Sequence, residues 1–285
     1  MSKKVLSLIC VALLVLSAVG LAACGSSTPA SNTSNTTSNS STSSLKTLTA
    51  GKLTIATGQP AYSPWVEDNK PESGKGFEAA VAYAIANKMG FKNSDVVWVR
   101  TDFDAAIAPG PKNFDLNLQQ YSITPERQKV VDFSSPYYTT AQAIVTYSNS
   151  QYASATTVAA FQDAKIGVAA GSTSLTLAQR LFKNVSPFND NDTAVQALKS
   201  GQIDAIVVDI PTAWYITGAE LDNSKIVGEL PSEDTQGDQL ACLLPKNSPL
   251  TSAVSKAVDE LRSDGTLSKL ENQWLLSGGS IPMLK

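Results

Sequence analysis

The sequence has 285 residues, enough for one large domain or two modest ones, and its hydrophobic content of 42% fits a globular protein with an ample core. The formal net charge of −3 gives no electrostatic case for binding nucleic acid. Histidine is missing from the sequence, which excludes His-dependent catalytic triads and removes the commonest ligand of transition metals. We therefore expect neither a metal site nor a cofactor.

The N-terminus has the pattern of an export signal. Lys3 and Lys4 precede an apolar run over 5–19, which is short for a membrane-spanning helix, the alternative interpretation. The following Leu-Ala-Ala-Cys-Gly at 21–25 resembles a bacterial lipobox. That resemblance implies a signal peptide at 1–23, a lipidated Cys24 and anchoring to the outer face of the bacterial cell membrane. An ordinary cleavage site with an incidental cysteine is the alternative.

A tether is predicted between this anchor and the globular part. Residues 26–44 are almost wholly Ser, Thr and Asn, so they cannot bury a core, and we assign 24–50 to the lipidated cysteine and a flexible linker. Cys10 would leave with the signal peptide. Cys242 then remains alone in an apolar run, which indicates a buried, inert thiol.

Strands alternate with helices through the rest of the chain. We expect strands at 52–57, 96–100, 116–119, 141–147, 165–169, 203–208, 225–230 and 239–244. We expect helices at 76–90, 102–108, from Pro125, and at 171–183, 193–200, 210–217, 249–263 and 266–275. This alternation favours parallel α/β sheets, in two successive units.

Polar and aromatic side chains gather where these strands end or helices begin. They are Gln59, Tyr62, Phe103, Gln119, Gln120, Ser122, Arg127, Ser172, Thr173 and Asp209. Arg127 lies in the first turn of a helix capped by Thr124, where the helix dipole disfavours a cation, so a bound anion would explain its position. The helix beginning near Ser172 could bind an anion through its backbone N–H groups.

Each of these residues also has a structural alternative. Arg127 could be a surface residue paired with Glu126 or Asp132, and the two aromatic residues could belong to the core. The hydroxyl and carboxyl side chains could be helix caps. As a set, however, they supply a cation, a carboxylate, a helix N-terminus and apolar walls without a nucleophile–base pair, which suits a free α-amino acid.

The stretches 122–127 (Ser-Ile-Thr-Pro-Glu-Arg) and 131–138 (Val-Asp-Phe-Ser-Ser-Pro-Tyr-Tyr) carry a family resemblance. They resemble the signature of family 3 extracellular solute-binding proteins, receptors of polar amino-acid ABC transporters, and the similarity extends from about 52 to 274. It implies an α/β, two-lobed, type II periplasmic-binding-protein fold. Lobe 1 would comprise 51–142 and 238–285, lobe 2 would comprise 143–237, and hinge segments would lie near 142–145 and 235–239.

The resemblance also implies roles for individual residues. Arg127 would hold the ligand carboxylate with the N–H of Thr173. Asp209, Ser122 and the carbonyl of Gln120 would hold the ammonium group, and Tyr62 and Phe103 would enclose the ligand. The partners implied are a free amino acid and the permease subunits of an ABC transporter, with the receptor acting as a monomer.

Departures from the family pattern bear on the ligand. Gln59 replaces an acidic residue of many members, and Gln119-Gln120-Tyr121 replaces small residues, so a neutral polar ligand such as glutamine is weakly favoured. Two other functions remain open. A dehydratase or lyase could use Glu78 or Asp209 as its acid, but no acid–base pair is visible. A ligand-sensing surface receptor would bind identically without transport.

Overall fold

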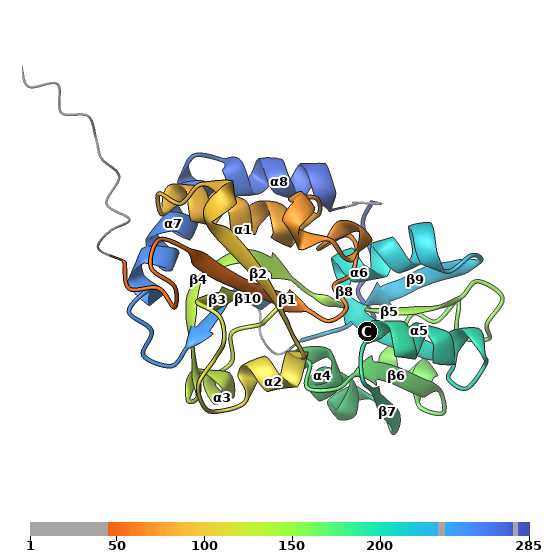
Figure 1. Ribbon diagram of the computed structural model, residues 1–285. Coiled ribbons are helices and arrows are strands. Elements are labelled where there is room, and N and C mark those ends of the chain that lie inside the picture. Colours follow the sequence, from red (N-terminus) through yellow and green to blue (C-terminus); the bar gives the residue numbers. More distant parts are fainter. Residues whose placement is uncertain (1–44, 233–236, 276–278) are drawn as a thin grey trace, which may run out of the picture. The chain divides into compact units, whose positions relative to one another are not determined.

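The computed structural model describes residues 45–232, 237–275 and 279–285. These residues form two α/β lobes, each built around a five-stranded sheet (Figure 1). The predicted signal peptide, the lipidated Cys24 and most of the linker lie outside the described residues. Within the described part of the chain, no helix has the length and apolar character needed to cross a membrane.

The sheet of lobe 1 has the strand order β2-β1-β3-β10-β4. Its strands are β1 (Leu53–Gly58), β2 (Val96–Thr101), β3 (Leu116–Asn117), β4 (Val131–Thr140) and β10 (Asp238–Pro245). β1 is parallel to β2 and β3, whereas β10 is antiparallel to β3 and β4. The sheet is therefore mixed, and the prediction of a parallel sheet is wrong in this respect, because the chain returns to lobe 1 from the opposite direction after building lobe 2.

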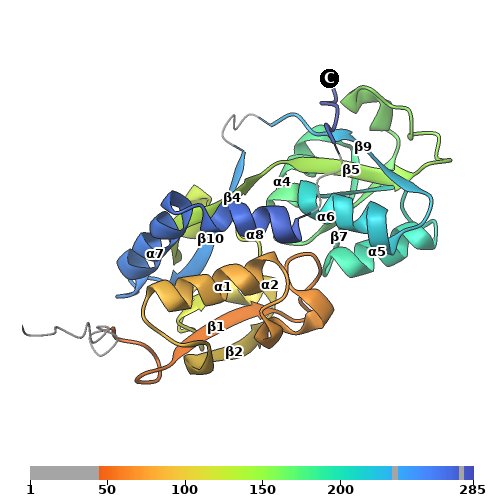
Figure 2. The same cartoon turned by 90° about the horizontal axis from the view of Figure 1, so that it is seen from above.

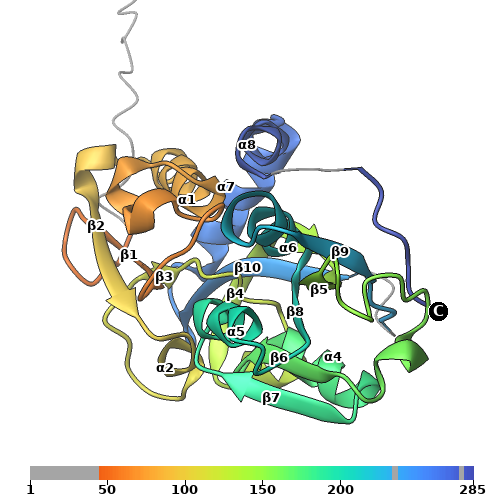
Figure 3. The ribbon, with the colours of Figure 1, turned by 90° about the vertical axis from the view of Figure 1, so that its right-hand side faces the viewer.

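Helices cover both faces of this sheet (Figures 1 and 3). The helices α1 (Phe77–Lys88), α7 (Thr251–Ser263) and α8 (Thr266–Trp274) pack against one another on one face. Apolar side chains such as Phe77, Ile85 and Leu116 fill the space beneath them and are fully buried. The short helices α2 (Phe103–Ile107) and α3 (Pro125–Gln128) lie on the opposite side, next to a smaller core that contains Tyr121.

The sheet of lobe 2 has the strand order β7-β6-β8-β5-β9. Its strands are β5 (Gln142–Tyr147), β6 (Lys165–Ala169), β7 (Asn184–Phe188), β8 (Ala205–Asp209) and β9 (Ser224–Glu229). β6 is parallel to β7 and β8, and β5 is antiparallel to β8 and β9. This sheet is also mixed, because β5 enters directly from lobe 1.

Three helices flank the second sheet: α4 (Thr173–Leu181), α5 (Asn191–Lys199) and α6 (Ile210–Tyr215). α4 packs on a core that contains Phe161, while α5 and α6 pack on the other face around Leu198 and Ile206. Short 3-10 segments occur at Glu67–Asn69, Pro71–Ser73, Asn93–Asp95 and Val158–Phe161, and a π-helical turn at Ile216–Glu220.

Two strands were not predicted. β4 contains Pro136 and pairs with β10 through register shifts, which interrupts the alternation that marks a strand. β7 contains Pro187 and lies at the edge of its sheet, where its side chains are mostly exposed. Neither segment carries a clean period-two pattern of apolar residues, because neither has one consistently buried face.

The end of the chain lies on lobe 2, not on lobe 1 where the interval 238–285 was expected (Figure 2). The backbone N–H of Leu284 donates to the carbonyl of Glu229 at 2.9 Å, and that of Lys285 donates to the carbonyl of Thr156 at 3.1 Å. The side chain of Leu284 is 1% exposed and belongs to the core beneath α4. Backbone pairing with β9 and burial of one leucine thus hold this terminus.

Candidate functional site

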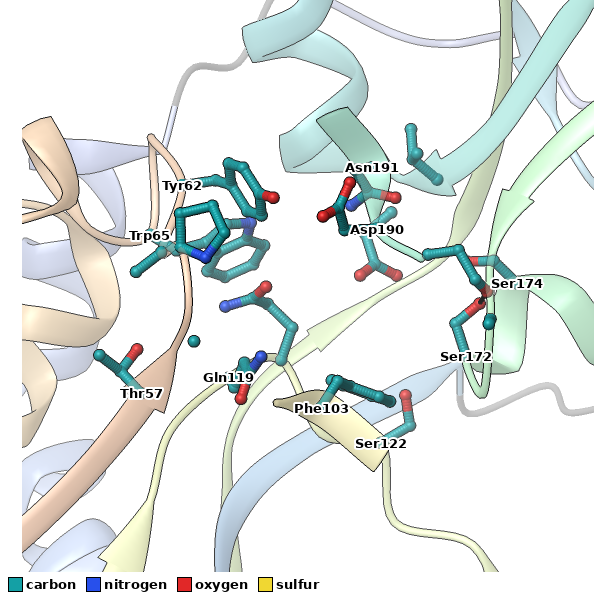
Figure 4. A pocket seen from close by; sticks show the side chains of 18 of the residues that line it. Thr57, Tyr62, Trp65, Phe103, Gln119, Ser122, Ser172, Ser174, Asp190 and Asn191 are labelled. Carbon is teal, nitrogen blue, oxygen red and sulfur yellow. Dashed lines mark hydrogen bonds between the residues drawn. The ribbon is translucent and has the colours of Figure 1, made fainter. Parts of the chain in front are cut away.

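A cavity is bounded by residues of both lobes, at strand ends and helix starts (Figure 4). Lobe 1 contributes Thr57, Gly58, Pro60, Ala61, Tyr62, Trp65, Val66, Phe103, Gln119, Gln120, Ser122 and Arg127. Lobe 2 contributes Ala169, Ala170, Ser172, Thr173, Ser174, Asn189, Asp190, Asn191, Val208 and Asp209. Every predicted ligand-binding residue lines this cavity except Gln59, which is exposed outside it.

Arg127 is buried at the start of α3 and is fixed by backbone carbonyls. Thr124 caps the helix by accepting from the Arg127 backbone N–H. The guanidinium donates to the carbonyl of Ser122 at 2.7 Å and, across the lobes, to that of Gly171 at 2.9 Å. It also lies 5.5 Å from the ring centroid of Phe103. A surface ion pair with Glu126 or Asp132 is therefore the wrong interpretation, since 7% of Arg127 is exposed.

Burial removes water from the Arg127 guanidinium, so a bound anion would stabilise its charge. Burial lowers the pKa of its guanidinium, which means that the charged form has lost favourable solvation. Its hydrogen-bond acceptors are neutral carbonyls, and the carboxylates of Asp238, Asp104 and Asp209 support its charge from nearby. A carboxylate placed in the cavity would add a direct charged contact. A guanidinium can bind such a group through two parallel hydrogen bonds.

Asp209 ends β8 and supplies a carboxylate to the same cavity. It precedes α6, but its side chain makes no capping hydrogen bond, so the alternative of a simple helix cap does not hold. Instead it accepts from the Gln142 amide at 2.8 Å. Burial and, to a smaller extent, the nearby Asp238 carboxylate together raise the pKa of Asp209 to about 7. A bound cation would favour its ionised form.

The start of α4 contributes hydroxyl groups and backbone N–H groups. Ser172 is indeed a helix cap, because its hydroxyl accepts from the backbone N–H of Leu175 at 3.1 Å. Thr173 is the first residue of the helix, so its N–H has no intrahelical acceptor. Its hydroxyl bonds the Asp238 carboxylate at 3.0 Å and lies 3.2 Å from the Ser122 hydroxyl. These contacts connect the two lobes next to the cavity.

Tyr62 and Phe103, the two predicted aromatic residues of the cavity, are half-buried rather than fully buried. Phe103 stacks on Tyr121 with a centroid separation of 4.6 Å and an interplanar angle of 22°. Tyr62 has a buried hydroxyl that makes no hydrogen bond of ordinary geometry within the described chain. Trp65, which was not predicted, is 1% exposed, and its indole N–H donates to the Thr212 hydroxyl at 3.0 Å across the lobes.

Gln120 has a strained backbone that a buried carboxylate supports. Its φ is +52°, which is unusual for a residue with a side chain. Glu78 accepts from the Gln120 backbone N–H at 2.7 Å, and also from the Gln120 amide and the Tyr137 hydroxyl. Burial raises the pKa of Glu78 to about 7. Glu78 does not line the cavity, so its role is to position Gln120 and not to act as a general acid.

The structure brings further polar residues to the site. Gln142 on β5 donates to both Asp209 and Asp238, and accepts from Ser174. Asp190 was also missed, although the sequence offers a capping signal, because β7 was not recognised and the residue was not placed at a strand end. Among the described residues, no cluster of three or more His, Cys, Asp or Glu side chains could hold a metal ion.

Comparison with known proteins agrees with this geometry. Residues 53–277 match the family model described as bacterial extracellular solute-binding proteins, family 3. The chain belongs to this family. The L-cystine-binding protein TcyJ of Escherichia coli is 30% identical over 203 residues, 70% of this chain and 73% of that protein. The probable histidine-binding protein of Campylobacter jejuni is 32% identical over 232 residues, 79% of this chain and 86% of that protein.

Solved structures support the same assignment. The structure titled an ancestral arginine-binding protein bound to arginine is 34% identical, with a TM-score of 0.65, over 79% of this chain and 98% of that chain. The expected two-lobed, type II periplasmic-binding-protein fold is thereby confirmed. These relatives are binding proteins, not enzymes, and we assign no enzymatic activity to this family 3 protein.

Proposed function

We propose that this family 3 protein binds a free α-amino acid in the cavity and delivers it to the membrane permease of an ABC importer. One observation carries the proposal: the Arg127 guanidinium and the Asp209 carboxylate line a single cavity from different lobes. These two charges complement the carboxylate and ammonium ends of a zwitterion. The names of the relatives, which refer to cystine, arginine and histidine, support this ligand class.

The ligand carboxylate would bind the Arg127 guanidinium and the Thr173 N–H. Its ammonium group would bind Asp209, the Ser122 hydroxyl and the Gln120 carbonyl, whose strained backbone Glu78 holds. Tyr62 and Phe103 would enclose the apolar part of the ligand. Because these groups come from both lobes, a ligand that bridges them stabilises the arrangement in which the lobes touch.

We also propose how the chain is divided between the two lobes, the hinge and the membrane anchor. Lobe 1 would comprise 51–142 together with most of 238–285, lobe 2 would comprise 143–237 together with the C-terminal segment, and the lobes would move about 142–145 and 235–239. Residues 1–23 would direct export, Cys24 would carry lipid, and the rest of 24–50 would tether a monomeric receptor to the outer face of the cell membrane.

Two of the residues that favoured a glutamine-like ligand in the sequence do not line the cavity. Gln59 is exposed and does not line the cavity, and Tyr121 is fully buried beneath Phe103. Gln119 and Gln120 do line the cavity, but the Gln120 amide donates to Glu78, and the side-chain Oε1 of Gln119 accepts from the Tyr121 hydroxyl at 2.9 Å. The proposal therefore names an α-amino acid without this preference.

Calorimetric titration tests the function. The full-length protein, purified in detergent and freed of co-purified ligand by unfolding and refolding, is titrated with the twenty amino acids singly and with cystine. We expect saturable binding of one or a few of them and loss of binding in Arg127→Ala. Arg262→Ala is the matched control, since that exposed arginine pairs with Asp259 away from the cavity. Absence of binding by every amino acid would overturn the proposal.

A further inference from the structure

The part of the cavity lined by Tyr62, Asp190 and Asn191 is acidic. Figure 4 shows Asp190 and Asn191 on one side, facing Tyr62 and Gln119 on the other. An adjoining hollow shares Tyr62 and Asn191 with the cavity and is lined by three further carboxylates, those of Asp68, Asp192 and Glu220. Neither lining includes a lysine, and Arg127 is the single cation among the described residues that line the two.

An α-amino acid bound between Arg127 and Asp209 would leave the Asp190 carboxylate without a counter-charge. The carboxylate of an α-amino acid would compensate Arg127, and its ammonium group would compensate Asp209. Asp190 would then face the ligand as a carboxylate without a counter-charge, and within the described chain it takes part in no ion pair. Because this carboxylate is part-exposed, a cation on the ligand would add a favourable charged hydrogen bond without a large cost of desolvation.

Asp190 also has a structural role, which leaves one of its oxygens available. It caps α5, and its Oδ1 accepts from the backbone N–H of Thr193 at 2.8 Å and from the Thr193 hydroxyl at 2.8 Å. The cap does not use Oδ2, and the Asp190 carboxylate also interacts with the Tyr62 hydroxyl. The cap therefore fixes the orientation of the side chain, and the second oxygen lies outside the cap.

Tyr62 places a hydroxyl beside the same carboxylate. The hydroxyl is buried and has no hydrogen bond of ordinary geometry within the described residues, but it lies close enough to the Asp190 carboxylate for a side-chain hydrogen bond to contribute to its raised pKa. Burial raises the pKa of this hydroxyl, and the carboxylates of Asp190, Asp192 and Glu220 raise it further. The hydroxyl thus stays neutral in a negative field, and its oxygen can accept a hydrogen bond from a cationic donor.

We propose that Asp190 and the Tyr62 hydroxyl form a subsite for a cationic group at the end of the ligand side chain, either a guanidinium or an alkylammonium. This inference rests on the proposed function, because Arg127 and Asp209 must hold the amino-acid end. The outer carboxylates of Asp192 and Glu220 add a field that attracts such a ligand towards the cavity. The specificity of the site is then determined by lobe 2, in the connection between β7 and α5.

Paired ligands that share an apolar stem and differ in charge test the subsite. The full-length, ligand-free protein is titrated at pH 8 with arginine and citrulline, and with lysine and norleucine. In each pair the apolar stem is alike and only one member is cationic. We expect at least one cationic member to bind about tenfold or more tightly than its neutral counterpart, which is the scale of one charged hydrogen bond.

Two variants with the same change in net charge locate the effect. Asp190→Asn retains a side chain that caps helices well and removes the charge in the cavity. Asp192→Asn removes a charge that lies two residues further along, outside the cavity lining. We expect Asp190→Asn to abolish the difference between the paired ligands and Asp192→Asn to retain most of it.

The results of these titrations distinguish a failure of the cationic subsite from a failure of the proposed amino-acid receptor. If neutral members bind as tightly as cationic ones, or if the difference survives in Asp190→Asn, the subsite is wrong and the amino-acid receptor stands. If only amino acids outside these pairs bind, with no cationic side chain, the subsite is equally wrong. If no amino acid binds at all, the proposed function fails and the subsite fails with it.

Discussion

The hydrogen bond between Trp65 and Thr212 gives a direct test of coupling between lobe contact and affinity. The indole N–H on lobe 1 donates to the hydroxyl on lobe 2 at 3.0 Å, and the two residues are 1% and 7% exposed. Thr212→Val removes the acceptor with little change of shape, so the N–H is left buried and unpaired when the lobes touch. In a separated arrangement the same N–H would be hydrated. Thr212→Val therefore destabilises only the arrangement in which the two lobes touch.

Leaving a buried donor unpaired costs about 1–3 kcal/mol. If the ligand binds only when the lobes touch, this cost appears in full as a loss of affinity of roughly 5- to 150-fold. Calorimetric titration with the amino acid identified for the wild type measures it. Thr212 does not line the ligand cavity, so direct loss of a ligand contact is not the cause.

Thr217→Val is the matched control. Its hydroxyl donates to the carbonyl of Ala213 at 2.9 Å within the same segment of lobe 2, so it removes a hydroxyl without touching lobe 1. We expect its affinity to stay within about twofold of the wild type. An unchanged affinity in Thr212→Val, with its fold intact by circular dichroism, would refute the coupling of ligand binding to this contact.

Three further predictions follow from burial and charge. Because burial raises the pKa of Asp209 to about 7 and a ligand ammonium needs its ionised form, affinity should be constant above pH 8 and fall below pH 7 by at most about tenfold per unit. At pH 6, ligand binding should release the proton of Asp209, which calorimetry in buffers of different ionisation enthalpy detects. Binding without proton release, or an unchanged pH profile in Asp209→Asn, would contradict this prediction. Leu284→Ala should lower the free energy of unfolding by about 2–5 kcal/mol, since the side chain is 1% exposed; a change below about 1 kcal/mol in urea titrations would show that the C-terminal segment does not stabilise lobe 2. Glu78→Gln should weaken binding, because the carboxylate accepts three hydrogen bonds that an amide cannot all accept: those from the Gln120 backbone N–H, the Gln120 side-chain amide and the Tyr137 hydroxyl. The control Glu72→Gln, at an exposed position, should bind the ligand like the wild type when assayed in parallel.

Local features of this protein were accessible from the sequence because their physical causes are local. The cap of α3 follows from Thr124 and Pro125, and the structure has that helix at Pro125–Gln128 with the predicted cap. The strands β1, β6 and β8 are apolar runs between turns or helices, as expected for buried strands. The predicted ligand-binding residues follow strands or begin helices, and all but Gln59 line one cavity.

Other features depended on contacts between distant segments. The antiparallel place of β10, the path of the C-terminus to β9 and the bond between Trp65 and Thr212 join residues far apart in the chain. No local periodicity encodes which strand lies beside another after the chain has crossed between lobes.

The same reason applies to the acidic end of the cavity. In the sequence, Asp190 has the signature of a helix cap, and Tyr62 is an aromatic residue in a proline-rich loop. Only the tertiary structure places the two against one cavity, 128 positions apart, where the Tyr62 hydroxyl meets a carboxylate that has no cationic partner among the described residues. Sequence alone thus determined the class of ligand-binding scaffold, whereas the packing of the lobes determined which charges the ligand would have to match.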